Sequence, residues 1–240
     1  MKLIEKIRAK QDDLFGAPSV TIAFLGDSVT QGCFECSMNG TKIETVYESR
    51  NSFSEKVKQI FGLLYPTVQV NIINSGIGGD SAPNGLARFD RDITPFSPDL
   101  VVVGYGLNDS GAGLDGITRY TDALNGIFQK IDALGAEAIF LTPNMMNTNV
   151  SPSLTDEFLR NLAKNFAVTQ NAGILDRYVD AAREVAAQNG VRVCDIYKKW
   201  KTMSSCGVNV TEMLANRLNH PVRELHWMTA YSLIEMIFKE

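Results

Sequence analysis

Five short apolar segments recur along the chain, and each ends beside polar or glycine residues. They cover residues 20–25, 68–73, 100–103, 138–141 and 191–194. Runs of valine, isoleucine and leucine without polar alternation are typical of strands buried on both faces, as in a parallel sheet. The pattern therefore predicts a central, mainly parallel sheet of five strands.

Amphipathic segments lie between these apolar runs and indicate helices. We expect helices over residues 1–15, 52–64, 117–134 and 223–238, and a longer helical stretch over 154–188 that breaks near 171–173. Alternating strands and helices with right-handed crossovers place helices on both faces of the sheet. The predicted fold class is α/β, a three-layer α/β/α sandwich. No repeat or linker divides the chain, so we expect a single domain over 1–240.

The composition argues against several partners. The chain of 240 residues is 45% hydrophobic and 21% charged, which is enough apolar material for one sizeable core. Its formal net charge of -4 and the lack of a basic run make a nucleic-acid partner improbable. No apolar run approaches the roughly 20 residues that span a bilayer. The N-terminal segment MKLIEKIRAKQDDLFG lacks the apolar core of a secretory signal, so we expect a cytoplasmic protein.

The cysteines and histidines do not form a recognisable metal motif. Cys33 and Cys36 make a C-x-x-C pair, but Cys194 and Cys206 are too far apart to supply the second close pair of a structural zinc site. The first pair also follows its strand too distantly for a thioredoxin-like motif. The chain has only two histidines, so a three-histidine zinc site is excluded. We expect reduced thiols, no metal and no cofactor.

Chemically active side chains follow the predicted strands. The first strand leads into Gly26-Asp27-Ser28, and the third leads into Gly106-Leu107-Asn108-Asp109. In open α/β sheets, ligands bind outside the carboxyl ends of the strands. A serine there is well placed as a nucleophile, although an isolated Asp-Ser pair is more often a helix cap. Asn108 is either an oxyanion donor or part of an ordinary turn.

The second strand leads into a glycine-rich turn at residues 74–81. Its glycines allow backbone N–H groups to approach a ligand and donate to an oxyanion. The turn lacks the lysine of a phosphate loop and the glycine spacing of a dinucleotide site. It is therefore either an oxyanion donor or a tight turn without a catalytic role.

His220 precedes Pro221, which keeps the histidine outside the closing helix. From a loop at the start of that helix, its imidazole can reach the sheet edge and take a proton from Ser28. His226 falls within the helix beside Trp227, where we expect a structural or surface role.

Together, these four segments resemble the SGNH hydrolase superfamily, also called the GDSL esterase/lipase family, over residues 21–237 or so. The resemblance implies the flavodoxin-like SGNH hydrolase fold. It also implies that Ser28 is the nucleophile and His220 the catalytic histidine. The oxyanion hole would then consist of the backbone N–H groups of Ser28 and Gly79 and the side chain of Asn108.

The sequence departs from the family at the catalytic acid. The family usually carries aspartate three residues before its histidine, and Arg217 occupies that position here. Without a carboxylate, the imidazole lacks the partner that fixes its tautomer in a serine-protease triad. We therefore predict a Ser28–His220 dyad with another orienting group. The candidates are a main-chain carbonyl near Arg217 or Leu218 and the side chains of Asn216, Asn219 and Glu224.

The predicted activity is that of a serine esterase that hydrolyses small carboxylic esters with short acyl groups such as acetyl, with acetylated carbohydrates among the candidate substrates. The partner would be a small-molecule ester substrate. Residues 33–51, with Met38, Tyr47 and Arg50, are expected to form a polar loop that walls the pocket. One alternative is a non-catalytic binding module that retains the pocket. Another is a flavodoxin-like nucleotide binder, which the fold allows but no phosphate loop supports.

Overall fold

The computed structural model describes residues 2–239, and its main sheet has five strands in the order β4-β1-β5-β6-β7. The strands are β1 (Val20–Gly26), β4 (Val70–Gly76), β5 (Leu100–Gly104), β6 (Glu137–Leu141) and β7 (Arg192–Cys194). Every neighbouring pair in this sheet is parallel. The predicted fold class and the five predicted strands are confirmed.

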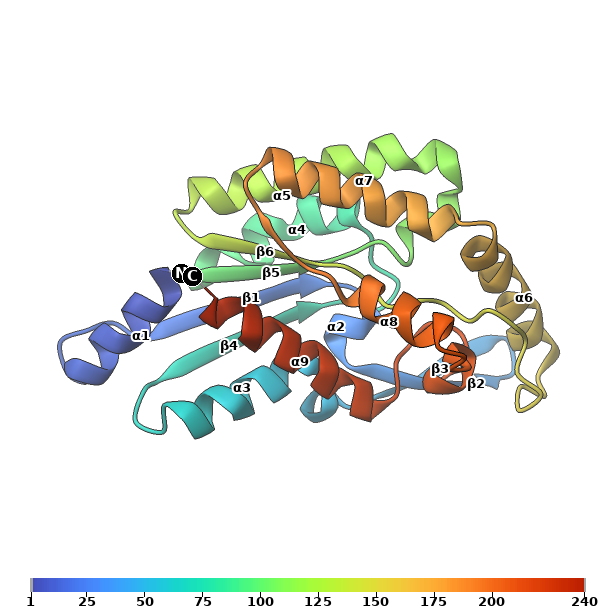
Figure 1. Cartoon of the computed structure of the whole chain (residues 1–240), viewed down its shortest axis with the longest axis horizontal. Coiled ribbons are helices and arrows are strands. Elements are labelled where there is room, and N and C mark those ends of the chain that lie inside the picture. Colours follow the sequence, from blue (N-terminus) through green and yellow to red (C-terminus); the bar gives the residue numbers. More distant parts are fainter. Residues whose placement is uncertain (1, 240) are drawn as a thin grey trace.

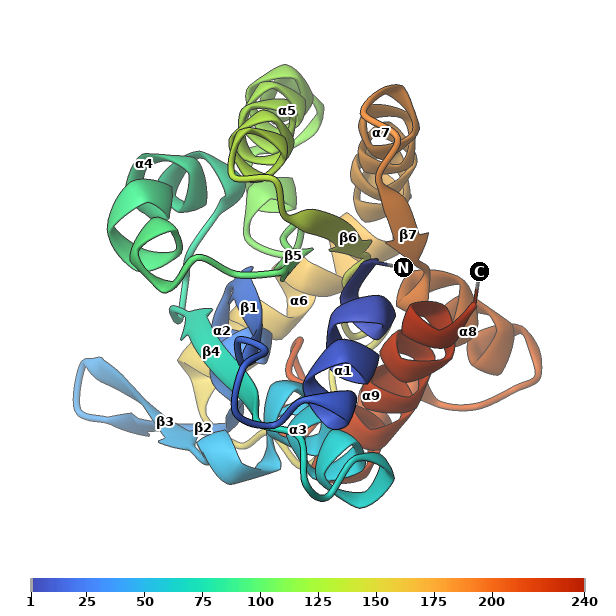
Figure 2. The same cartoon turned by 90° about the vertical axis from the view of Figure 1, so that its left-hand side faces the viewer.

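Helices cover both faces of the sheet (Figures 1 and 2). One face carries α4 (Ala82–Asp92), α5 (Ile117–Ala133) and α7 (Ile174–Gln188). The opposite face carries α1 (Lys2–Asp12), α3 (Phe53–Leu64) and α9 (Arg223–Phe238). The remaining helices are α2 (Ser28–Gln31), α6 (Glu157–Asn171) and α8 (Ile196–Ser205). Short 3₁₀ turns occur at Ser49–Asn51, Thr94–Phe96, Asp109–Ala112, Leu114–Gly116 and Val210–Met213.

The central strand β1 shows why the chain folds this way. All of its residues are buried, as expected for a strand covered by helices on both faces. Caps define where helices begin: the Ser52 side chain accepts the N–H of Glu55 at the start of α3, and Asp156 accepts the N–H of Leu159 at the start of α6. The predicted break in the long helical stretch is present at Gly173, whose φ of 73° separates α6 from α7.

The segment expected to be a polar loop is instead an antiparallel hairpin, so that prediction is wrong. Its strands are β2 (Cys33–Asn39) and β3 (Lys42–Tyr47), and they lie outside the main sheet. No residue of β3 is buried. Strands without a buried face have no alternation of apolar and polar residues, which is the usual sequence signal for a strand.

Three helices, the single turn α2 and the longer α4 and α8, were also not predicted. Pro83 and Gly85 obscure the helical pattern of α4, although proline is favourable in a first helical turn. None of the helices within residues 2–239 combines the length and the apolar character that crossing a bilayer requires.

The carboxyl ends of the strands all point to one edge of the sheet (Figure 1). At this edge the chain places α2, the β2–β3 hairpin and α6, whereas the chain termini lie toward the opposite edge (Figure 1). The residues singled out in the sequence therefore come together at the edge where ligands bind in open α/β sheets.

Candidate active site

Ser28 is the first residue of α2 and follows β1 after a tight turn. The carboxylate of Asp27 caps this short helix by accepting the N–H of Val29 at 2.9 Å. A Cβ at Gly26 would lie 2.7 Å from the carbonyl oxygen of Gly104, so only glycine fits between β1 and β5. Ser28 is only 5% exposed, and this close packing fixes the position of its side chain.

His220 contacts Ser28 directly. Its Nε2 atom lies 2.9 Å from Ser28 Oγ, and its Nδ1 atom lies 2.9 Å from the carbonyl oxygen of Phe34. A carbonyl only accepts hydrogen bonds, so Nδ1 carries the proton and Nε2 is the free acceptor for the Ser28 hydroxyl. Burial lowers the pKa of His220 below its usual 6.5, although the Phe34 carbonyl acts in the opposite direction.

The Phe34 carbonyl is not among the orienting groups proposed from the sequence, so those candidates were wrong. Arg217 has a left-handed φ of 59° and donates to the carbonyls of Glu212 and Leu214 at 2.6 and 2.7 Å. Glu224 is exposed on α9.

Asn216 and Asn219 shape the loop that carries His220 instead of contacting its imidazole. The Asn216 side-chain oxygen accepts the backbone N–H groups of Leu218, Asn219 and His220, each at 3.0 Å. The Asn219 carbonyl accepts the side-chain N–H of Asn144 at 2.9 Å. These bonds satisfy the buried backbone of the loop and hold its turn in one conformation.

Gly79 and Asn108 line the same cleft as Ser28 and His220, so the structure brings all four predicted site residues together. The cleft has a volume of about 190 Å³. Gly79 has a φ of 76°, which favours glycine. A Cβ at this position would meet nothing within 4 Å, so glycine is not required by close packing. The Asn108 side-chain N–H donates to the carbonyl of Asp80 at 2.8 Å. An amide nitrogen carries two N–H groups, so Asn108 retains a second donor.

A buried ionic network around Arg88 lies behind this part of the cleft. The guanidinium is 2.7 Å from Asp80, the neighbour of Gly79, and 2.9 Å from Asp92. It also donates to the carbonyl of Gly26 at 3.1 Å and to the hydroxyl of Tyr105 at 3.0 Å. One side chain thus joins the end of β1, the loop after β4 and the segment after β5. The sequence reasoning missed this network, although Arg88 and Asp92 have the i,i+4 spacing of a helical ion pair.

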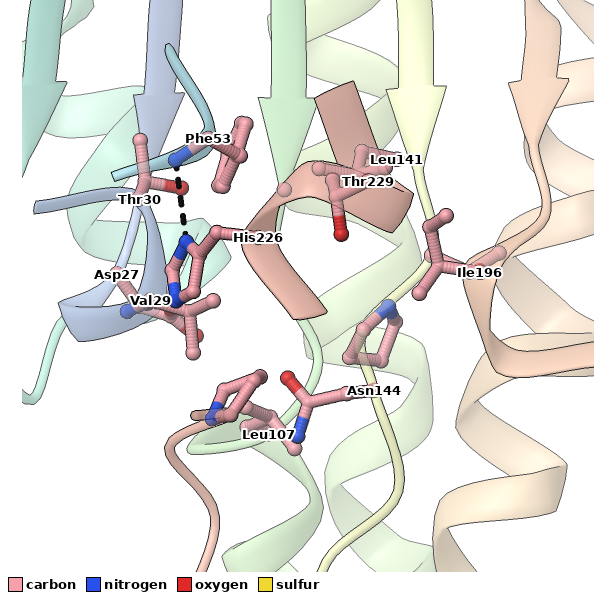
Figure 3. Close-up of a pocket in the computed structure, with 14 residues that line it drawn as sticks. Asp27, Val29, Thr30, Phe53, Leu107, Leu141, Asn144, Ile196, His226 and Thr229 are labelled. Carbon is pink, nitrogen blue, oxygen red and sulfur yellow. Dashed lines mark hydrogen bonds between the residues drawn. The ribbon is translucent and has the colours of Figure 1, made fainter. Parts of the chain in front are cut away.

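A second cavity of about 30 Å³ lies between the strand ends and α9 (Figure 3). Asp27 and Pro221, the neighbours of Ser28 and His220, line it together with His226. The Nδ1 atom of His226 accepts the backbone N–H of Phe53 at 3.0 Å. Its Nε2 atom has no partner among residues 2–239. His226 is therefore a buried structural residue, as one of the two sequence alternatives stated.

Burial has opposite effects on the two ionisable groups of this cavity. It lowers the pKa of His226 to about 3, because a buried imidazolium loses its hydration. It raises the pKa of Asp27 to about 7, and the nearby carboxyls of Asp109 and Asp80 add to that effect. His226 therefore stays neutral at neutral pH, whereas Asp27 titrates close to it.

The walls of the cleft come from the β2–β3 hairpin and from α6. The lining includes Ile43, Thr45 and Tyr47 of β3 and Leu162 and Phe166 of α6. Tyr47 is thus in the wall, as predicted. Met38 packs beside the small cluster formed by Leu159 and Leu218, and Arg50 is not part of the lining. Cys33 and Cys36 also line the cleft, and all four cysteines are free.

A parallel α/β sheet whose carboxyl edge carries a serine, a glycine turn, an asparagine and a histidine in this chain order defines the class of SGNH hydrolases. The GDSL-like Lipase/Acylhydrolase family matches residues 24–227 of this chain, and the chain belongs to that family.

Curated relatives match over a shorter stretch. An arylesterase of Vibrio mimicus is 35% identical over 86 residues, which cover 35% of this chain and 39% of the relative. An acetylxylan esterase of Geobacillus stearothermophilus is 29% identical over 91 residues, covering 37% of this chain and 39% of the relative. The matches thus span about two fifths of the length of these relatives.

Solved structures match over nearly the whole chain. An acetyl xylan esterase, AlAXEase, superposes with a TM-score of 0.67 at 18% identity, covering 91% of this chain and 100% of that one. The lipase/acylhydrolase from Enterococcus faecalis superposes with a TM-score of 0.65 at 20% identity, covering 91% of this chain and 95% of that one. At these identities the likeness establishes the shared fold.

Proposed function

We propose that this chain is a serine esterase in which Ser28 is the nucleophile and His220 is the general base. The observation that carries the proposal is the 2.9 Å contact between Ser28 Oγ and the unprotonated Nε2 of His220. Membership of a lipase and acylhydrolase family and the esterase names of the relatives support it.

The reaction would proceed in two steps. Ser28 gives its proton to His220 Nε2 and attacks the ester carbonyl, and the resulting oxyanion accepts hydrogen bonds from the N–H groups of Ser28 and Gly79 and from Asn108. The imidazolium then donates its proton to the leaving alcohol. In the second step His220 takes a proton from a water molecule that attacks the acyl-enzyme carbonyl. The imidazolium then returns this proton to Ser28 Oγ as the bond between Oγ and the acyl carbon breaks and the acid leaves. Burial of His220 favours the neutral imidazole that both steps require.

The cleft supports a small, uncharged substrate. Within residues 2–239, no aspartate, glutamate, lysine or arginine lines it. A charged ester would lose hydration there without gaining an opposite charge. Leu162, Phe166 and Leu218 supply apolar contact area near His220. We therefore propose a neutral ester with a short acyl group such as acetyl, with an acetylated carbohydrate or an aryl alcohol as the other half.

The test is hydrolysis of p-nitrophenyl acetate by the unsubstituted protein and by Ser28→Ala. Loss of the nucleophile should lower kcat by about 10³-fold or more, since nucleophile and base act as a unit. Ser205→Ala, which removes an exposed hydroxyl on α8, is the matched control and should keep full activity. Equal hydrolysis by Ser28→Ala and the unsubstituted protein would remove Ser28 from the mechanism.

The acyl preference needs a separate measurement. A series of p-nitrophenyl esters from acetyl to octanoyl should show kcat/KM falling steeply beyond butyryl. A preference for the longest chains would contradict the proposal of a small acyl site. Labelling by a fluorophosphonate distinguishes an esterase from a binding module, because only an activated serine reacts.

A further inference from the structure

The carbonyl that accepts the proton of His220 Nδ1 lies in an irregular part of the β2–β3 hairpin. Cys33 pairs with Tyr47 and Cys36 pairs with Thr45, and the register shifts between these two pairs. Phe34 lies within this bulge. A bulge interrupts the hydrogen-bond ladder between two strands, so the ladder alone does not fix the direction of the Phe34 carbonyl.

Arg223, in the first turn of α9, binds a residue of β2 and the residue that follows β3, at the base of this hairpin. Its guanidinium donates to the carboxylate of Glu35 at 2.6 and 2.9 Å and to that of Glu48 at 2.8 and 2.5 Å. Its central carbon also lies 4.4 Å from the centre of the Phe34 ring. Each of these pairs is a two-point contact, which fixes orientation as well as distance.

The positions of these partners in the chain connect them to the site. Glu35 directly follows Phe34, and Arg223 follows His220 by three residues. The backbone N–H of Glu48 donates to the carbonyl of Gly32 at 2.8 Å, and this hydrogen bond joins the two ends of the hairpin. The guanidinium therefore bridges the segment that holds the acceptor carbonyl and the segment that holds the imidazole.

The pairing favours the charged form of both carboxylates. The Arg223 guanidinium lowers the pKa of Glu48 to about 2 and lowers that of Glu35 as well. Both carboxylates are partly exposed, so their pairing adds little to the stability of the fold. The arrangement is better suited to fixing geometry than to stabilising the folded state.

We propose that Arg223 is a positioning residue: by joining Glu35 and Glu48 to the start of α9, it holds the Phe34 carbonyl against His220 Nδ1. Arg223, Glu35 and Glu48 are called the arginine clamp below. The clamp rests on the proposed esterase function, because the Phe34 carbonyl that it holds takes the place of the aspartate that orients the histidine in other family members. It acts through His220 and touches no substrate.

The test is the steady-state kinetics of Arg223→Met, which keeps apolar contact with the Phe34 ring but loses the charge and all donors. We expect kcat for p-nitrophenyl acetate to fall by about 10- to 100-fold, the effect of displacing a catalytic group by about 1 Å. KM should change by less than about threefold, because the cleft walls are untouched. Arg223→Lys, which restores the charge without the planar fork, should recover part of kcat.

The matched control is Arg183→Met. Arg183 also binds two carboxylates, those of Asp180 and Asp195, and its side chain is 33% exposed, against 30% for Arg223. It lies on α7, on the other face of the sheet, so its loss should leave kcat unchanged. As a single substitution, Glu35→Gln should lower kcat. Added to Arg223→Met, it should lower kcat little further, because both substitutions break the same contact.

Each outcome decides the proposal. A folded Arg223→Met variant with the kcat of the unsubstituted protein would overturn the clamp and leave the esterase function standing. An equal loss in Arg183→Met would also overturn it, since the effect would then be general. If Arg223→Met fails to fold, Arg223→Lys and Glu35→Gln decide, and full kcat in both overturns the clamp. If the unsubstituted protein neither hydrolyses esters nor reacts with a fluorophosphonate, the esterase function falls, and the clamp with it.

Discussion

The two sides of the cleft are each held by an arginine that binds two carboxylates, but the arginines differ in their surroundings. On the side of Gly79 and Asn108, the side chain of Arg88 is 8% exposed and binds Asp80 and Asp92. On the side of His220, the Arg223 side chain is 30% exposed. The same chemical group thus acts in a low-dielectric interior on one side and in contact with water on the other.

This difference in burial separates folding from positioning. Removing one partner of a buried ion pair leaves an unpaired buried charge and costs about 3–5 kcal/mol, whereas an exposed pair contributes about 0–1 kcal/mol. Arg88 is therefore expected to stabilise the folded state and to fix the Asp80 backbone beside the proposed oxyanion site. Arg223 is expected to affect the rate of reaction more than the stability. Substitutions on the two sides should differ in kind.

The largest effect is expected for Arg88→Met. It leaves Asp80 and Asp92 without their shared cation in the interior, so the free energy of unfolding should fall by about 3–5 kcal/mol in urea denaturation. Arg91→Met is the matched control, because Arg91 binds the same Asp92 but its side chain is 72% exposed. That variant should lose less than about 1 kcal/mol. Similar losses in the two variants would contradict the comparison between buried and exposed arginines.

Asn108→Ala should have the next largest effect, and on activity instead of stability. If Asn108 is an oxyanion donor, as proposed, its loss should lower kcat by about 10²- to 10³-fold, while KM changes little. Steady-state kinetics on p-nitrophenyl acetate measures both constants. Asn161→Ala, at an exposed position of α6, is the control. A rise in KM with unchanged kcat would instead mean that Asn108 binds the ground state.

The pH dependence of kcat/KM tests the role of His220 as the general base. Protonated His220 cannot accept the Ser28 proton, and burial holds the pKa of His220 below 6.5. Activity should therefore stay constant above that pH and fall about tenfold for each pH unit below the apparent pKa. Two carboxyls also titrate in this range, because burial raises the pKa of Asp27 to about 7 and that of Asp109 to about 6. The profile is thus measured in Asp27→Asn and in Asp109→Asn as well. An acid limb that disappears in either variant, or one centred above pH 6.5, would contradict the assignment to His220.

The smallest effect is expected for Arg217→Asp, which places the residue typical of the family before His220. Because the Phe34 carbonyl already occupies Nδ1, kcat should change by less than about threefold. The left-handed φ of residue 217 is tolerated by aspartate, and Arg217→Asn provides a neutral control of the same shape. A gain in kcat of more than about tenfold for Arg217→Asp alone would show that His220 lacks an effective partner in solution.

Features that depend on the identity of side chains were predictable from the sequence. The apolar runs predicted the strands of the main sheet, and their polar ends predicted that Ser28, Asn108 and His220 gather at one edge. The glycine-rich turn before Asp80 was predictable for the same reason. These features follow from burial and from the common direction of parallel strands.

Features that depend on the main chain or on long-range pairing were not predictable. The Phe34 carbonyl has no signature, because every residue carries a carbonyl and only the tertiary structure brings this one to His220. Only the first two residues of β2 and none of β3 are buried, so the hairpin has no buried face and lacks strand periodicity. Arg223 reads in the sequence as an ordinary residue of the first turn of α9, and its partners Glu35 and Glu48 lie more than 170 positions away.

The use of a backbone carbonyl next to His220 changes which mutations the protein tolerates. A substitution at position 34 alters the ring but keeps the carbonyl, so no single replacement of that residue deletes the acceptor. Insertions and deletions act differently, because successive peptide groups of an extended strand face opposite ways. Removing one residue between Cys33 and Cys36 would turn this oxygen away from the imidazole. The catalytic geometry is thus more sensitive to the length of this segment than to its composition.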